Sequence, residues 1–271
     1  MSAQALFRSR FVLGALFLLF VLGAALIAAF AVGDPFQPSE TILAEPSRGH
    51  PLGTDELGRD VLTRVLHGAA TALKIGIPPA LVAAVIGVSV GLSTGYFGGL
   101  VDGALLKLIE FTLVVPRFVI ALVVAALFGG SLWVVGLVLA ATFWPSTARL
   151  VRAEVISLKE REFAEAARSL GATDLRILAR HLLPLAMPIV AVNTSFQAGQ
   201  AALIETGLAY LGVGDRNVVS WGAMLADAQS YLGIAWWTSV FPGVALALLI
   251  LSTNLLGDGL SDAWNARVRR T

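Results

Sequence analysis

Residues 160–184 read EREFAEAARSLGATDLRILARHLLP, and this stretch decides the fold class of a chain that is otherwise mostly apolar. Hydrophobic residues make up 57% of the 271 residues and charged residues 14%, and the mean hydropathy is +0.81. Soluble domains carry roughly 25% charged residues, so most of this chain is suited to lipid. A charged segment between two apolar runs of bilayer length therefore indicates a soluble partner at the membrane surface.

The apolar runs predict an all-α membrane protein with six transmembrane helices, because a spanning helix needs ~20 apolar residues. The six segments are 11–33, 75–97, 104–128, 131–151, 185–206 and 236–257. Ala29-Phe30-Ala31 resembles a signal-peptide cleavage site, but the first run exceeds the ~7–15 apolar residues of a signal peptide, which favours a retained anchor. Pro116 should kink the third segment, since proline removes a backbone hydrogen bond.

The placement of Lys and Arg predicts the orientation, because cytoplasmic segments are enriched in these residues. With the N-terminus inside, twelve lie on the inner side: Arg8, Arg10, Arg149, Arg152, Lys159, Arg161, Arg168, Arg176, Arg180, Arg267, Arg269 and Arg270. Four lie in the outer loops: Arg48, Arg59, Arg64 and Arg216. Both termini and the charged segment are therefore expected in the cytoplasm.

The charged segment is predicted to form two short helices joined by a sharp bend. Gly171 can adopt a positive φ and end the first helix, and Thr173 or Asp174 can cap the second. The apolar face is expected at Phe163, Ala167, Leu170, Leu175, Leu178 and Leu182. The polar face mixes acidic and basic residues, which suits a protein cleft better than a lipid surface.

Two further patterns concern the outer loop and the second span. Thr54 or Asp55 is expected to cap a short amphipathic linker helix, with a substrate-guiding lip as the alternative. Gly87, Gly91 and Gly95 recur every four residues, which predicts close helix packing inside a bundle.

Polar residues inside spans are candidate functional residues, because their burial in hydrocarbon is costly. Asn193, Gln197 and Gln200 share one stripe that could line a translocation path or form interhelical hydrogen bonds. Glu205 could belong to a gate or pair with an outer-loop arginine. Arg117 could neutralise a substrate carboxylate or enter a buried ion pair.

Several kinds of chemistry have no residues to support them. The chain has no cysteine, and its three histidines lie far apart, so no metal site is expected. It contains no phosphate-binding loop of the G-x-x-x-x-G-K-[ST] type, so any energy from ATP must come from a partner. An intramembrane enzyme is disfavoured because no histidine and no facing aspartates lie within spans, so no catalytic residue is expected.

The spacing of Glu165-Ala166-Ala167, Gly171 and Leu183-Pro184 resembles the EAA signature of membrane subunits of bacterial ABC importers. His181 replaces an aliphatic residue, as the oligopeptide and dipeptide branch tolerates. Four other stretches resemble the C-type permeases of dipeptide, oligopeptide and nickel importers: His50–Asp60, Glu205–Gly214, Ser220–Met224 and Asn254–Leu260. The chain departs from that pattern at Leu185 and at Trp264-Asn265-Ala266.

The resemblance implies a type I ABC importer permease fold, with an N-terminal anchor and outer loop (1–72) and a five-helix core (73–271) containing the EAA loop 160–184. Glu165, Ala166, Ala167, Gly171 and Pro184 would form or shape a coupling helix that docks on an ATPase.

The same resemblance implies the partners and the cargo. The partners would be a homologous B-type permease in a heterodimer, two ATP-binding subunits that hold ATP and Mg²⁺, an extracytoplasmic binding protein and membrane lipid, but no nucleic acid. The chain itself would bind no cofactor and catalyse no reaction. The implied location is the bacterial plasma membrane. The favoured cargo is di- or oligopeptides, and the alternative is nickel or another small solute.

Overall fold

The computed structural model describes residues 3–31 and 33–268 of the chain. Within these ranges the regular structure is helical, with only two isolated β-bridges in the first loop. The α-helices are α1 (Ala3–Ala31), α2 (Val61–Phe97), α3 (Gly99–Val114), α4 (Arg117–Phe128), α5 (Leu132–Lys159), α6 (Glu162–Ser169), α7 (Asp174–Ile177), α8 (Leu183–Tyr210), α9 (Trp221–Ala228) and α10 (Trp237–Val268). The all-α prediction is confirmed.

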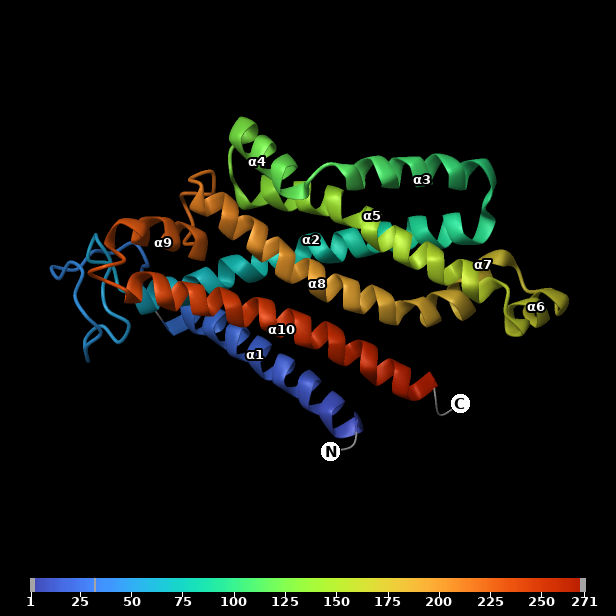
Figure 1. The fold of residues 1–271 in the computed structure, drawn as a ribbon, viewed down its shortest axis with the longest axis horizontal. Coiled ribbons are helices and arrows are strands. Elements are labelled where there is room, and N and C mark those ends of the chain that lie inside the picture. Colours follow the sequence, from blue (N-terminus) through green and yellow to red (C-terminus); the bar gives the residue numbers. More distant parts are fainter. Residues whose placement is uncertain (1–2, 32, 269–271) are drawn as a thin grey trace.

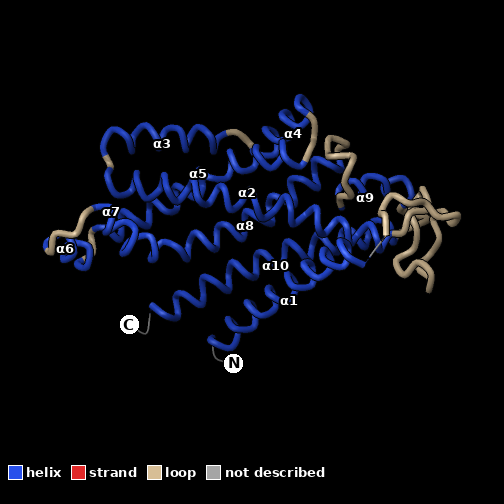
Figure 2. Tube along the Cα trace, turned by 180° about the vertical axis from the view of Figure 1, so that it is seen from behind, coloured by secondary structure: helices blue, strands red, loops and turns tan. Residues whose placement is uncertain are grey.

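The long helices run lengthwise in an elongated bundle (Figure 1). Helices α1 and α10 lie side by side along one flank, and α3 lies on the opposite flank beside α5. Figure 2 shows the same arrangement from behind: α6 lies at one end, and α9 and the first loop lie at the other. The N-terminal end of α1 and the C-terminal end of α10 both lie toward the α6 end, as the predicted topology requires.

Five helices are long and apolar enough to cross a membrane, and a sixth crossing results if the bent pair α3–α4 counts as one span. The predicted span 104–128 is therefore not one continuous helix. Its two parts meet at 76°, with Val115 in extended backbone and Pro116 immediately before α4. Proline disfavours helical backbone at the residue before it. The expected kink at Pro116 is a complete break.

The predicted surface helix capped by Thr54 or Asp55 is wrong. Those residues lie in a turn-rich loop, and the helix begins at Val61 after Asp60, whose carboxylate accepts from the Thr63 backbone N–H at 2.8 Å. Helix α2 is 37 residues long and includes Pro78-Pro79. It runs without a break across the predicted boundary between the N-terminal unit 1–72 and the core 73–271. The later residues of the expected linker, from Val61 onward, are thus the first turns of a spanning helix.

The glycine stripe of α2 packs against α5, as its spacing predicts. Gly87, Gly91 and Gly95 are buried. A Cβ atom added at any of them would lie 2.5–2.9 Å from the nearest atoms of α5. The two backbones therefore approach as closely as the absence of side chains allows.

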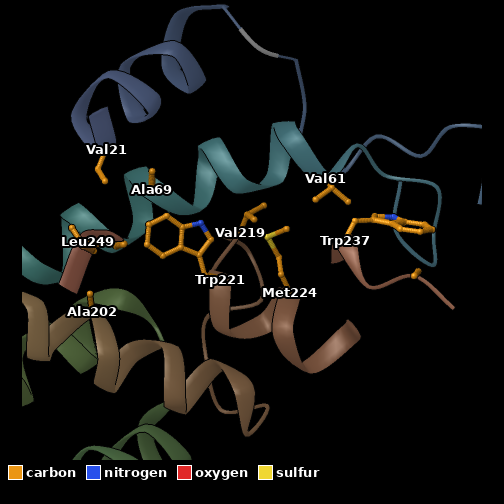
Figure 3. Packing of buried hydrophobic residues seen from close by; sticks show 11 residues of the cluster. Val21, Val61, Ala69, Ala202, Val219, Trp221, Met224, Trp237 and Leu249 are labelled. Atoms are coloured by element: carbon orange, nitrogen blue, oxygen red, sulfur yellow. The ribbon is translucent and has the colours of Figure 1, made fainter. Parts of the chain in front are cut away.

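Two tryptophans pack at the end of the bundle that carries the first loop (Figure 3). Trp221 lies against α2 and donates from Nε1 to the Val65 carbonyl oxygen at 3.0 Å. Trp237 donates from Nε1 to the Thr54 carbonyl oxygen at 3.0 Å. Each indole combines apolar burial with a satisfied N–H, so the pair attaches α9 and the first loop to the bundle.

Candidate functional site

Residues 162–182 form a bent hairpin at one end of the bundle (Figure 1). Helix α6 ends at Ser169, and Gly171 has a φ of 78°, in the left-handed region. The Ala172 N–H then donates to the Ala167 carbonyl oxygen at 3.0 Å, which satisfies an end of the helix. No atom lies within 4 Å of a Cβ built on Gly171, so glycine is needed for the backbone angle and not for space. The predicted bend is confirmed.

The inner face of the hairpin is anchored in an apolar cluster. Ala164, Ile177 and Leu182 are fully buried, and Ile177, Leu178 and Leu182 pack with Val151, Val155 and Leu158 of α5. Phe163 and Ala167 pack partly buried against the same cluster. Ile177 was not among the predicted face residues, although the predicted Leu178 and Leu182 are buried beside it.

Two residues of the predicted apolar face, Leu170 and Leu175, are exposed on the outer side of the hairpin, so that part of the prediction is wrong. Leu170 is 88% exposed and Leu175 is 76% exposed, so neither packs on the bundle. Glu165 and Ala166 are also exposed, and Ala167 is partly buried. Two large apolar side chains and a carboxylate are thus presented at the end of the molecule.

The second hairpin helix does not end before the next span. A π-helical turn over Leu178–Leu182 connects α7 directly to α8. Pro184 is the second residue of α8, where it cannot donate to the carbonyl group four residues earlier, and its ring would collide with that group. The wider turn accommodates the proline, so α7 and α8 form one continuous helical rod over Asp174–Tyr210.

Tyr96, at the inner end of α2, joins the two halves of the hairpin. Its hydroxyl donates to Asp174 Oδ1 at 2.6 Å, and the Arg168 guanidinium lies 5.6 Å from its ring centroid. Lys159 Nζ donates to the Gly95 carbonyl oxygen at 2.9 Å. A polar pocket of about 410 Å³ lies among Tyr96, Lys159, Glu160, Glu165 and Arg168. Sequence reasoning missed Tyr96, although an aromatic residue at the end of a span is a usual interfacial anchor.

The polar residues Asn193, Gln197 and Gln200 of α8 contact two different helices, α5 and α4. Asn193 Nδ2 donates to Thr147 Oγ1 at 2.8 Å, and Gln197 Nε2 donates to Thr147 Oγ1 at 3.2 Å and to Ser146 Oγ at 3.0 Å. The structure thus brings Asn193 and Gln197 together on α5. Gln200 lies apart from them and accepts from Arg117 of α4 at 3.4 Å.

Glu205 is buried, with 4% of its surface exposed, and its polar neighbour is Ser220 at the start of α9. It forms no ion pair with an arginine in the described part of the chain, because Arg59 and Arg64 are held by other acids. The carboxyl group instead lies where α8 meets α9.

An ionic cluster, which the sequence did not predict, holds the first loop against α9. The Asp55 carboxylate pairs with Arg59 at 2.7 Å and with the buried Arg64, and both arginines reach Asp227 of α9 at 3.4 Å. Glu56 pairs with Arg59 at 2.7 Å through one oxygen. The other oxygen is buried without a partner, and burial raises the pKa of Glu56.

A cavity of about 840 Å³ lies among α1, α2, α8 and α10 and is lined almost entirely by apolar side chains, including Leu73, Ile77, Met187 and Leu249. Such a lining suits hydrocarbon and offers no set of polar groups that would orient a hydrophilic solute. The site residues discussed above lie elsewhere.

Comparison with known proteins agrees with this arrangement. Residues 87–270 match the family described as the inner membrane component of binding-protein-dependent transport systems. The chain is 35% identical over 263 residues to the dipeptide transport system permease protein DppC of Bacillus subtilis, covering 95% of this chain and 82% of the relative. It is 34% identical over 254 residues to DppC of Alkalihalophilus pseudofirmus, covering 93% and 83%.

A third relative is named for the transport of glutathione. The chain is 37% identical over 225 residues to the glutathione transport system permease protein GsiD of Pectobacterium atrosepticum, covering 83% of this chain and 75% of the relative. The resemblance of residues 160–184 to ABC importer permeases is thereby confirmed, as is the multi-pass membrane fold. This chain belongs to the family of inner membrane components of binding-protein-dependent transport systems.

Proposed function

We propose that this chain is a membrane-spanning subunit of an ATP-driven peptide importer and that the hairpin 162–182 docks on an ATPase subunit. The observation that carries the proposal is the contrast between the two faces of the hairpin. Ala164 and Ile177 anchor it to the bundle, whereas Leu170, Leu175 and Glu165 are exposed. Exposed apolar side chains beside a charge are typical of a protein interface.

The continuity of the hairpin with α8 supports a role in coupling. A force applied to α6 or α7 reaches α8 through the π-helical turn, and it reaches α2 through Tyr96. Glu165 supplies the interface charge, Ala166 and Ala167 allow close approach, Gly171 supplies the bend, and Pro184 sets the connection to α8. A partner moving the hairpin would therefore move two spanning helices.

The proposed complex contains this chain, a homologous B-type permease, two ATPase subunits and an extracytoplasmic binding protein within membrane lipid. ATP and Mg²⁺ are held by the ATPase subunits, since the present sequence has no phosphate-binding loop. This chain transfers motion and lines the path, and it performs no reaction itself.

We place the hairpin and both termini in the cytoplasm and the first loop outside the bacterial plasma membrane. Two observations support this orientation. The chain ends point toward the hairpin end of the bundle (Figure 1), and twelve of the 19 Lys and Arg residues lie on that side in the predicted topology.

Peptides are the proposed cargo because the relatives named above are dipeptide and glutathione permeases. Asn193 and Gln197 hold α8 to α5. Gln200 and Arg117 are the proposed polar lining of the path, and Glu205, which is buried where α8 meets α9, is proposed to belong to its gate. The N-terminal unit 1–72 and the core 73–271 are proposed to act together, since α2 crosses their boundary without a break.

The docking assignment is tested with Glu165→Lys and Gly171→Leu in the reconstituted complex, with Glu40→Lys as a matched charge reversal. Glu40 is exposed in the first loop, at the opposite end of the bundle. We expect both hairpin variants to insert into the membrane but to lose ATPase co-purification and peptide uptake, while Glu40→Lys retains the ATPase. A side chain at Gly171 is disfavoured by about 1–2 kcal/mol at positive φ. Normal uptake by both hairpin variants would refute the docking role.

A further inference from the structure

Arg117 occupies an unusual place, at the break inside a membrane-spanning segment. It is the first residue of α4, directly after Pro116, and its side chain is half-buried. Its guanidinium lies 5.2 Å from the ring centroid of Phe143 and donates to Gln200 Oε1 at 3.4 Å. Phe143 and Gln200 lie near the middle of α5 and in the outer half of α8, so the guanidinium lies within the depth of the bundle.

The charge of Arg117 has no counter-ion in the described residues. No carboxylate in those residues pairs with the Arg117 guanidinium, whose contacts are the Phe143 ring and Gln200. Arg152 of α5, by contrast, has a counter-ion, because its Nε and Nη2 each donate to an oxygen of Asp102 at 2.7 Å. Arg59 and Arg64 also have carboxylate partners within the chain.

A guanidinium at membrane depth is expensive unless an anion or water compensates it, so such residues usually mark a solute pathway. The N-terminus of α4 contributes further positive potential, and no side chain caps it. A carboxylate would compensate both the guanidinium and the helix N-terminus, since its two oxygens match the planar donors of a guanidinium.

We propose that Arg117 forms a carboxylate-binding site on the translocation path, which receives a carboxylate of the transported peptide. The phenyl ring of Phe143 holds the Arg117 guanidinium in place, and Gln200 supports it from α8. This inference rests on the proposed function and adds a specificity: peptides with a free carboxylate pass more readily than peptides in which it is blocked.

The test is uptake of Ala-Ala and of its C-terminal amide by the complete complex in proteoliposomes with saturating binding protein. The same binding protein serves every variant, so its own preference cancels when the acid-to-amide ratio is compared between variants. We expect Arg117→Gln to lower Ala-Ala uptake by at least about tenfold, the factor that loss of one charged hydrogen bond supplies, and to lower amide uptake less than twofold. Arg117→Lys should restore part of the preference for the free acid.

Arg152→Gln is the matched control, because its partner Asp102 is in the same chain and its loss should affect both peptides equally. An unchanged acid-to-amide ratio in Arg117→Gln refutes the carboxylate site. Loss of the second permease subunit from purified Arg117→Gln complex also refutes it, since the carboxylate would then belong to that subunit. A wild-type complex that assembles but imports neither peptide refutes the proposed function itself.

Discussion

The packing of α2 on α5 predicts the effect of adding one methyl group at Gly91. A Cβ at this position would lie 2.7 Å from the Ala148 carbonyl oxygen and 2.7 Å from Val151 Cβ, whereas ordinary contacts begin at 3.4 Å. The obstructing atoms are a backbone oxygen and a β-carbon, so neither can rotate away. The two helices would have to separate locally by about 0.7 Å, the difference between those distances.

The expected cost follows from two opposing terms. Overpacking a close interface costs about 1–3 kcal/mol, while alanine stabilises a helix interior by roughly 0.5–1 kcal/mol relative to glycine. We therefore expect Gly91→Ala to lower the free energy of unfolding by about 1–2 kcal/mol. Adding Gly87→Ala should increase the loss, because that Cβ would lie 2.5 Å from Thr147 Cβ and displace the acceptor of Asn193 and Gln197.

The measurement is equilibrium unfolding of the purified chain in detergent micelles, with Gly103→Ala as the matched control. Gly103 lies within α3, and a Cβ built there meets no atom within 4 Å. The control should be neutral or more stable than wild type by up to about 1 kcal/mol. If Gly91→Ala is as stable as Gly103→Ala, the glycines are not required by the helix approach and the reasoning fails.

Two more predictions concern the ends of the bundle. Asp55→Asn leaves the buried Arg64 without its main counter-charge, so the free energy of unfolding should fall by about 3–5 kcal/mol. Glu40→Gln, in the exposed part of the same loop, should change the free energy of unfolding by less than about 0.5 kcal/mol. Equal effects of the two substitutions would contradict a stabilising role of the ionic cluster. Tyr96→Phe removes the hydroxyl that joins α2 to Asp174, a bond worth about 1 kcal/mol net. It should raise the ATP hydrolysed per peptide imported, whereas Tyr210→Phe at the opposite end should not, and an unchanged ratio would remove Tyr96 from the coupling route.

Local sequence features predicted the hairpin well where a single residue determines the backbone. Gly171 bends the chain because it alone tolerates a φ of 78° at no cost. Pro116 interrupts a span for an equally local reason. The predicted start of the first-loop helix failed because Thr54 and Asp55 are both competent caps, and the choice of Asp60 depends on long-range contacts. Thr54 is engaged by residues 41 and 44, and Asp55 by two arginines.

Periodicity also failed where burial depends on what lies opposite. Leu170 and Leu175 satisfy the same apolar pattern as Leu178 and Leu182, yet the first two are exposed and the last two are buried. No local feature distinguishes them, because the difference lies in whether α5 passes beside them. The partners of Asn193 and Gln197 were equally undetermined, since a polar stripe can face a pore or a neighbouring helix.

The sequence by itself determined the membrane class, the bend in the hairpin and the family. Each of these depends on composition or on residues close together in the chain, whose conformational preferences act locally. Only the tertiary structure decided which charges are compensated. Asp55 meets Arg64, and Asp102 meets Arg152, across the fold, but no carboxylate in the described residues reaches Arg117. Electrostatic pairing depends on distance in space, which helix packing sets and which residue order does not reveal.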